Sequence, residues 1–332
     1  MKKLDNTIHP HQSRRRCLLA FAGASLAMGP LSRLQAAAYP ERSVTIVCPF
    51  PPGGGSDNVA RLIAQHASTF FGQPFIVDNR SGAAGTIGVS YAAKAKPDGY
   101  TLIYLSSAVT IQPALQKLPY DIVRDLSPVS MVIKVPYVLA TSANSRFKSL
   151  DHFVAEAKRG ERITYGTYGM GSPPHLTMEQ LQSSAKFEIT HVPYRGEAAS
   201  VLDLLAGAID VAWVLPFAVL PHVKAGKLRL LGVSTNQRVP DLPGVAALGE
   251  VAPQIDIVGW GALMAPTGCP PHIIASLQTM VQSAVNVTAN ANRLREQGYT
   301  PVGSSSDTLK EVIGNELVSW ANLIREKNIR SE

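Results

Sequence analysis

The sequence has few cysteines, few charged residues and no long apolar run after residue 38. Three cysteines in 332 residues are too few for a disulfide framework. Charged residues make up 17% of the chain and hydrophobic residues 45%, which is typical of a globular protein and excludes a disordered one. The lack of a long apolar run beyond residue 38 excludes a later transmembrane helix. The length suits two domains.

Catalytic and metal-binding motifs are also missing. The sequence contains no G-x-S-x-G, H-E-x-x-H or C-x-x-C motif and no P-loop. The run Gly53–Gly55 is not a dinucleotide fingerprint, because Asn58 stands where its last glycine should be. Catalytic residues can be dispersed along a chain, so these absences lower the expectation of an enzyme without excluding one. We predict that the protein is not an enzyme and takes no cofactor or metal.

The net charge of +7 is concentrated at the N-terminus. Residues 1–38 contain six basic residues and one acidic residue, which leaves +2 for residues 39–332. That remainder has no run of Lys and Arg of the kind that follows a phosphate backbone. We therefore predict no nucleic-acid partner.

The same N-terminal segment has the order of an export signal. Ser13–Arg16 precede an apolar run from Cys17 to Met28, and the small residues Ala36–Ala38 follow. The apolar run is too short for a membrane anchor. The arginine pair is twin-arginine-like, although a Sec signal fits equally well. We predict cleavage near Ala38 and a periplasmic protein.

Two cysteines remain after such cleavage. Cys48 lies in an apolar run and Cys269 in a predicted loop. An oxidising compartment permits one disulfide between them, but two separate thiols, one buried and one in a loop, are the favoured interpretation.

From residue 43 onward, short apolar runs alternate with helical patterns. Strands are predicted at 43–48, 75–77, 100–105, 163–165, 187–191, 209–214, 228–234 and 256–265. Helices are predicted at 56–71, 86–95, 150–159, from 172, at 198–206, 217–225, 271–289 and 307–327. This alternation predicts an α/β fold of parallel sheets covered by helices. Two strand–helix sets separated by the segment around 131–140 predict two domains.

Five loops that follow predicted strands and precede helices are candidate ligand sites. Glycines let a backbone approach a ligand closely, and a helix N-terminus attracts anions. Hydroxyls at the carboxyl end of a strand are well placed for ligand contact. The candidate residues are Pro52, Gly53, Gly54, Ser56 and Asp57; Ala83 and Ala84; Ser106, Ser107 and Thr110; Gly171, Ser172 and His175; and Tyr194, Arg195 and Gly196.

Each candidate also has a purely structural interpretation. Ser56 or Asp57 can cap the first helix, and Ser172 reads as the cap of a later one. His175 is more readily explained as a packed histidine than as a ligand group. Arg195 offers a bidentate partner for a carboxylate but is equally an exposed surface residue.

The motifs PFPPGGGSD, NRSGAAGTIG, KPDGYTL, YGTYGMGSPPHL and VPYRGEAASVLDLLAGAID occur in this order after the export signal. Together they resemble the Bug family, the receptors of tripartite tricarboxylate transporters, over essentially the whole mature chain. The resemblance implies a two-lobed periplasmic-binding-protein fold (type II-like). Two Rossmann-like domains, residues 39–137 plus 260–332 and residues 138–259, would be joined by two crossover strands with the ligand cleft between them.

The resemblance also implies a function. A monomeric receptor would hold a small carboxylate (a di- or tricarboxylate, an amino acid or an aromatic acid) through backbone amides, hydroxyls and waters of the five loops. Integral membrane permease subunits would then receive the ligand. A sensor for a membrane signalling partner, or an exported enzyme, remains the alternative. Glu197 departs from the family pattern, which has a small residue after the glycine, and we expect its charge to disfavour a second ligand carboxylate.

Overall fold

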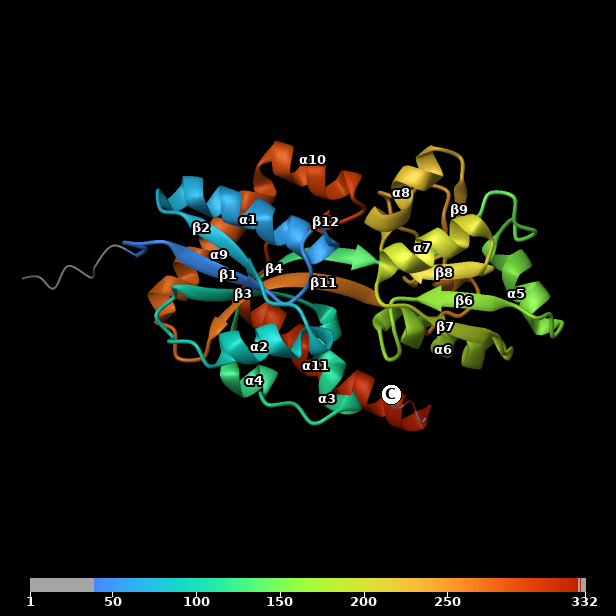
Figure 1. Cartoon of the computed structure of the whole chain (residues 1–332), viewed down its shortest axis with the longest axis horizontal. Helices are drawn as coiled ribbons and strands as arrows, with labels where there is room; N and C mark the ends of the chain where they lie inside the picture. Colours follow the sequence, from blue (N-terminus) through green and yellow to red (C-terminus); the bar gives the residue numbers. More distant parts are fainter. Residues whose placement is uncertain (1–38, 328, 330–332) are drawn as a thin grey trace, which may run out of the picture. The chain divides into compact units, whose positions relative to one another are not determined.

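The computed structural model describes residues 39–327 and residue 329. The predicted export signal and its cleavage site therefore lie outside the described residues. Two six-stranded sheets organise the described chain (Figure 1).

The first sheet has the strand order β12-β4-β11-β3-β1-β2. Its strands are β1 (Val44–Cys48), β2 (Phe75–Asn79), β3 (Thr101–Ser106), β4 (Leu126–Pro136), β11 (Val258–Pro266) and β12 (Thr300–Pro301). β1 is parallel to both β2 and β3, whereas β11 is antiparallel to β3 and β4. The β-branched run of β1 suits this central position, since its side chains are almost all buried.

The second sheet has the order β10-β9-β5-β8-β6-β7. Its strands are β5 (Val138–Ser142), β6 (Thr164–Thr167), β7 (Thr190–Pro193), β8 (Val211–Val214), β9 (Leu228–Val233) and β10 (Ala246–Ala247). β6 is parallel to β7 and β8, and β5 is antiparallel to β8 and β9. Both sheets are thus mixed, which corrects the prediction of parallel sheets.

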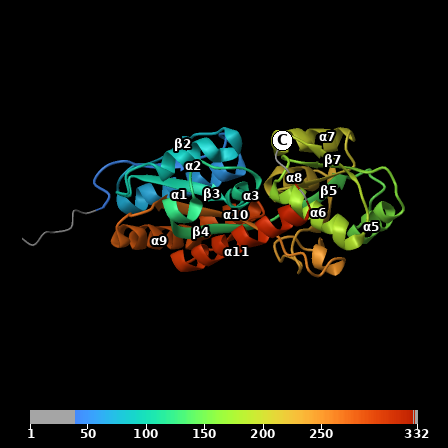
Figure 2. The ribbon, with the colours of Figure 1, turned by 90° about the horizontal axis from the view of Figure 1, so that it is seen from below.

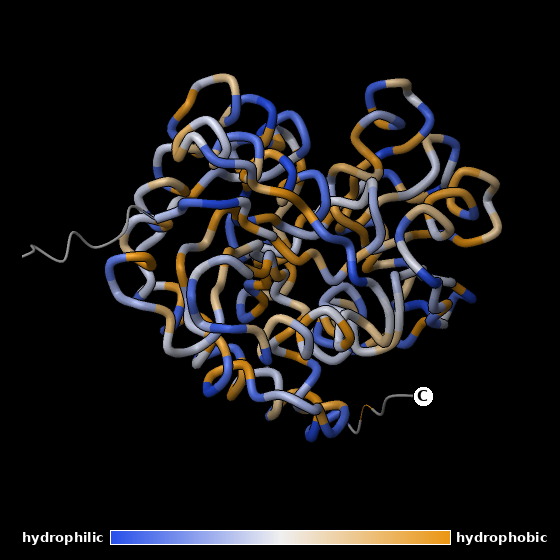
Figure 3. Tube along the Cα trace, turned by 60° about the vertical axis from the view of Figure 1, so that its left-hand side comes forward, coloured by the Kyte–Doolittle hydropathy of each residue, from blue (hydrophilic) through white to orange (hydrophobic). Residues whose placement is uncertain are grey.

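Helices cover both faces of each sheet (Figure 1). Around the first sheet they are α1 (Gly55–Phe71), α2 (Thr86–Ala93), α3 (Gln112–Leu115), α4 (Ile122–Asp125), α9 (Pro271–Asn286), α10 (Thr288–Glu296) and α11 (Ser306–Glu326), with 3-10 turns η1 (Ala83–Gly85) and η2 (Ser107–Thr110). Around the second they are α5 (Leu150–Lys158), α6 (Pro173–Ala185), α7 (Glu197–Ala206), α8 (Pro216–Lys224) and the turn η3 (Leu248–Glu250). Figure 3 shows hydrophilic segments on outer helices and turns, as expected for amphipathic elements.

Helix α11 packs against both sheets. Leu309 and Ile313, near its start, belong to the apolar cluster on one face of the first sheet. Trp320 and Ile324, further along, belong to the apolar cluster of the second sheet. Figure 2 shows α11 running from beneath β4 toward α6. One helix therefore shares its apolar face between the two cores.

Several predicted elements are confirmed within one residue, among them α1, α8 and α11. Others were wrong. The predicted helix 271–289 is two helices, because Val287 between α9 and α10 is extended (φ −66°, ψ 119°). The segment at 131–140, predicted to separate the two sets, holds the end of β4 and the start of β5. The strand predicted at 187–191 lies at 190–193.

Both cysteines are free and buried, which agrees with the favoured interpretation of two separate thiols. Burial raises the pKa of each to about 11.

Candidate functional site

The five predicted loops lie at the carboxyl ends of parallel strands. In the first sheet, β1, β2 and β3 run in one direction, so the loops after Cys48, Asn79 and Ser106 leave the same edge. In the second sheet, β6, β7 and β8 also run together, which places the loops that follow them at one edge. This is the edge at which open α/β sheets bind ligands.

The glycine loop after β1 is held by Asp57. This buried carboxylate accepts hydrogen bonds from the Gly53 amide (2.9 Å), Arg61 Nε (2.8 Å) and Asn79 Nδ2 (2.8 Å). Burial opposes ionisation, but the bonds from Arg61, Gly53 and Asn79 outweigh it and lower the pKa of Asp57. Asp57 therefore fixes the loop rather than pointing a free oxygen toward a ligand.

The start of α1 also differs from the prediction. Gly54, in extended conformation, is the N-cap, and no side chain caps the helix, so neither Ser56 nor Asp57 does so. Pro52 and Gly53 are exposed, and Ser56 is half-buried. The loop thus presents backbone in front of an uncapped helix N-terminus, which attracts anions.

The loop after β2 carries two alanines in the left-handed region. Ala83 (φ 45°) and Ala84 (φ 51°) are both exposed. This conformation costs a non-glycine residue about 1–2 kcal/mol. Such strain concentrates at functional sites, and the loop follows the strand beside β1.

The hydroxyls after β3 are mostly buried. Ser106 is half-buried, Ser107 is buried, and its Oγ lies 3.4 Å from Tyr137 Oη. Thr110 Oγ1 lies 2.7 Å from the Ser107 carbonyl oxygen and 2.8 Å from Glu316 Oε2. The Thr110 hydroxyl is therefore engaged within the protein, and Ser106 and Ser107 are the hydroxyls closer to a ligand-binding role.

The contacts of Thr110 bear on the protonation state of Glu316. A hydroxyl has one hydrogen, yet the Ser107 carbonyl and an ionised Glu316 would both need it. A protonated Glu316 would resolve this, because its O–H could donate to Thr110 while Thr110 donates to Ser107. Trp260 Nε1 donates to the other oxygen, Oε1, at 2.9 Å. In agreement, burial raises the pKa of Glu316 to about 7.

In the second sheet, the loop after β6 confirms Ser172 as an N-cap. Its Oγ accepts from the His175 amide and donates to the Gly169 carbonyl. His175 Nδ1 accepts from the Gly171 amide at 3.1 Å, and its ring stacks on His191 at 4.3 Å. His175 is buried, which is the packed position favoured from the sequence.

The loop after β7 contains Tyr194, Arg195 and Gly196. Tyr194 Oη donates to Asp203 Oδ2 at 2.6 Å, and burial followed by this contact raises the pKa of Tyr194 to about 12. Arg195 is exposed, and Gly196 (φ 119°) is the N-cap of α7. Of the three, the Gly196 backbone and the Arg195 side chain are available to a ligand.

Two aromatic pairs that sequence analysis missed lie near these loops. The ring centroids of Phe217 and Tyr299 lie 6.4 Å apart. Tyr137 hydrogen-bonds Tyr168 as well as contacting Ser107. After burial, the charge of Glu197 raises the pKa of Tyr137, Tyr168 and Tyr299 further. We call Tyr137, Tyr168, Phe217 and Tyr299 the aromatic group.

Close approaches bring the edges of the two sheets together. A Cβ at Gly55 would lie 2.5 Å from Tyr299 Oη and 2.8 Å from Phe217 Cε1. A Cβ at Gly171 (φ +65°) would collide with the side chain of Leu115 in α3. Only glycine fits these positions, where residues of one sheet's edge contact elements of the other.

The aromatic group had little sequence signal. Tyr168 lies inside the motif YGTYGMGSPPHL, directly after a predicted strand, which could have marked it. The other three come from segments far apart in sequence: the β4–β5 junction, α8 and the turn before β12. Only tertiary packing places them together.

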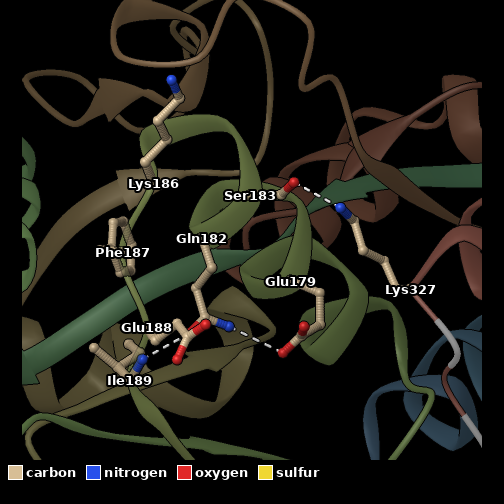
Figure 4. Close-up of a pocket in the computed structure, with 8 residues that line it drawn as sticks. All are labelled: Glu179, Gln182, Ser183, Lys186, Phe187, Glu188, Ile189 and Lys327. Atoms are coloured by element: carbon tan, nitrogen blue, oxygen red, sulfur yellow. Dashed lines mark hydrogen bonds between the residues drawn. The ribbon is translucent and has the colours of Figure 1, made fainter.

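A separate depression of about 620 Å³ lies beside α6 and the end of α11 (Figure 4). Lys327 Nζ donates to Ser183 Oγ at 2.6 Å, and Gln182 bridges Glu179 and the Ile189 amide. None of the predicted ligand-binding residues lines it. Its polar contacts tie α11 to α6.

Residues 39–327 and 329 contain no cluster of three His, Cys, Asp or Glu side chains suited to a metal ion. Within that same part, no helix has the length and apolar character needed to cross a membrane.

Comparison with known proteins identifies relatives along most of the chain. The family described as the tripartite tricarboxylate transporter family receptor matches residues 59–329. BugT of Bordetella pertussis (strain Tohama I) is 36% identical over 315 residues, which cover 93% of this chain and 97% of that protein.

Solved structures agree. Rpa4515 of R. palustris with adipate has a TM-score of 0.81 at 33% identity and covers 88% of this chain and 99% of its own. MatC of Rhodopseudomonas palustris with bound malate has a TM-score of 0.76 at 28% identity and covers 86% of this chain and 100% of its own. These similarities confirm the two-lobed periplasmic-binding-protein fold. The matched family consists of transport receptors, not enzymes, as expected from the missing motifs. The chain belongs to the tripartite tricarboxylate transporter receptor family.

Proposed function

We propose that the protein is an extracytoplasmic receptor that binds a small carboxylate between two lobes and delivers it to the membrane subunits of a tripartite transporter. One observation carries this proposal: the loops at the carboxyl edges of the two sheets approach elements of the opposite sheet at Gly55, beside Phe217, and at Gly171, beside Leu115. Relatives with adipate and with malate support a carboxylate as the ligand class. The protein acts as a monomer in the periplasm.

The two lobes are residues 39–137 with 260–332, and residues 138–259. This division is supported by the chain path, because Tyr137 separates β4 of the first sheet from β5 of the second, and β11 returns the chain to the first sheet. Ligand would draw the lobes together, since contacts from both edges form only in the closed state.

The proposed binding residues are the exposed or half-buried members of the five loops. Amides of Gly53, Gly54, Ala83 and Ala84 and the hydroxyl of Ser106 would receive the carboxylate from the first sheet. Arg195 and the Gly196 amide would meet it from the second. Asp57, Thr110, Ser172 and His175 would hold these loops in place, as their hydrogen bonds indicate.

Thermal unfolding of the full chain with a panel of organic acids and their neutral amides tests the proposal. The protein is first unfolded and refolded to remove any ligand carried through purification. A ligand at 100 times its dissociation constant adds about 2.7 kcal/mol of stability. We expect shifts with acids and none with their amides, and equal shifts or none at all would refute carboxylate binding.

Export is tested separately. N-terminal sequencing of the protein from the periplasmic fraction is expected to begin at Tyr39. A start at Met1 in that fraction would contradict cleavage near Ala38.

A further inference from the structure

Glu197 is a carboxyl group without a cationic partner. It begins α7, and its Oε1 accepts a hydrogen bond from the Leu215 amide at 2.8 Å. No Arg, Lys or His among residues 39–327 and 329 forms an ion pair with it. Burial raises its pKa to about 7, opposed only by the Leu215 amide. A charged, half-buried Glu197 therefore has no counter-charge among these residues.

Glu316 differs from Glu197 in its hydrogen-bond partners. It is also half-buried, but both of its oxygens have side-chain partners, Trp260 Nε1 and Thr110 Oγ1. Both carboxyl oxygens of Glu316 are therefore hydrogen-bonded within the protein. Glu197 has one donor, the Leu215 amide on Oε1, and no side chain of the described residues donates to it.

One ring of an aromatic pair lies close along the chain to the Leu215 amide that Glu197 binds. Glu197 is close enough to act electrostatically on Tyr137, Tyr168 and Tyr299, which come from three separate elements. Phe217 follows Leu215 by two residues and packs near Tyr299. Ring faces attract cations, most strongly where water is excluded. A carboxylate near aromatic rings is a chemistry that recognises an ammonium group.

We propose that Glu197 determines ligand specificity and that the ligand is an amino carboxylate, whose ammonium group meets Glu197 among the aromatic group while its carboxylate meets the glycine loops. This inference rests on the proposed function and names its substrate class. A dicarboxylate would instead place its second charge against Glu197, and like charges repel. The chain would thus differ from its relatives with adipate and malate.

The experiment uses isothermal titration of the full chain with matched ligands. The ligands are matched carboxylic acids of three to six carbons. At each length the series contains the ω-amino acid, the ω-hydroxy acid, the dicarboxylate and the unsubstituted monocarboxylate. The α-amino acids of the same lengths vary the spacing between the two charges. We expect an amino acid to bind at least about tenfold more tightly than its matched dicarboxylate and hydroxy acid, since a hydrogen bond to a charged group contributes more than a neutral one.

Two variants locate the effect. Glu197→Gln keeps an oxygen for the Leu215 amide and is expected to weaken amino-acid binding about tenfold or more while tightening dicarboxylate binding. Phe217→Leu keeps apolar volume without a ring face and is expected to weaken amino-acid binding only. Glu188→Gln, at an exposed position between α6 and β7, is the control and should change neither. Thermal melts of the unliganded variants check folding.

The outcomes separate this inference from the proposed function. Binding of dicarboxylates or hydroxy acids as tight as that of amino acids, or an unchanged preference in Glu197→Gln, overturns the amino-carboxylate inference and leaves the receptor intact. Binding of no acid in any series overturns both.

Discussion

Thr110 and Glu316 are 206 residues apart in sequence, and their side-chain oxygens lie 2.8 Å apart. The contact joins the turn after β3 to helix α11, with Trp260 of β11 on the other carboxyl oxygen. Burial raises the pKa of Glu316, so the network should respond to pH.

Glu316→Gln tests that response. Burial raises the folded-state pKa of Glu316 from 4.5 to about 7, so its protonation stabilises the fold fully below pH 4.5 and this contribution is lost as pH rises toward 7. The amide is always neutral and can donate to Thr110. The free energy of unfolding of the variant, minus that of the wild type, should therefore increase between pH 4.5 and 7 in urea titrations. A flat difference, like that expected for the exposed Glu311→Gln, would show that Glu316 ionises freely.

His191 should lower stability as the pH falls, whereas Glu316 lowers it as the pH rises. It stacks between Tyr165 and His175, and its ring nitrogen lies 2.8 Å from Thr167 Oγ1. Burial, and then the charge of His175, lower its pKa from 6.5 to about 3. Its neutral form stabilises the fold above pH 6.5, and this contribution is lost as pH falls toward 3.

His191→Asn is therefore expected to reduce the loss of stability between pH 6.5 and 3, measured by urea unfolding. The neutral amide cannot acquire the buried charge, although its smaller volume will lower stability at neutral pH. The exposed His272→Asn serves as control and should leave the pH slope as in the wild type. A slope unchanged in His191→Asn would mean that the histidine stack does not limit acid stability.

Trp320→Ala should weaken the attachment of α11 to the second sheet. Trp320 is 8% exposed and packs into the second-sheet core from a helix that begins on the first sheet. Truncation of a buried tryptophan costs about 3–5 kcal/mol. Val318→Ala, on an exposed face of the same helix (64% exposed), should cost less than about 0.5 kcal/mol. Urea unfolding measures the free energy of unfolding of both variants. Similar losses in the two would contradict a packing role for Trp320.

Gly55→Ala should impair ligand binding more than folding. The added Cβ meets Tyr299 Oη and Phe217, so the approach of α1 to the other sheet's edge is blocked. We expect the affinity for the ligand to fall about tenfold or more in isothermal titration. Gly314→Ala is the matched helix control, because its Cβ meets nothing within 4 Å, and it should gain about 0.5–1 kcal/mol of stability. Wild-type affinity in Gly55→Ala would show that this approach is not needed for binding.

The sequence by itself determined the parts of this protein that depend on local pattern. The β-branched run of β1, the spacing of α1 and the Ser172 cap were all predictable, because strand period, helix period and capping are properties of neighbouring residues. The ordered motifs also indicated the family. The glycine and hydroxyl loops were predictable as a set for the same reason, since each follows its own strand.

Only the tertiary structure decided which side chains those loops leave free. Asp57 and Thr110 read as ligand groups in the sequence, but partners 22 and 206 residues away occupy them. Tyr137 and Tyr299 carried no local signal, because their contacts come from other sheets and helices. The antiparallel pairing of β4 and β11 could not be predicted either. Strand direction is fixed by pairing with distant strands and not by the residues of the strand itself.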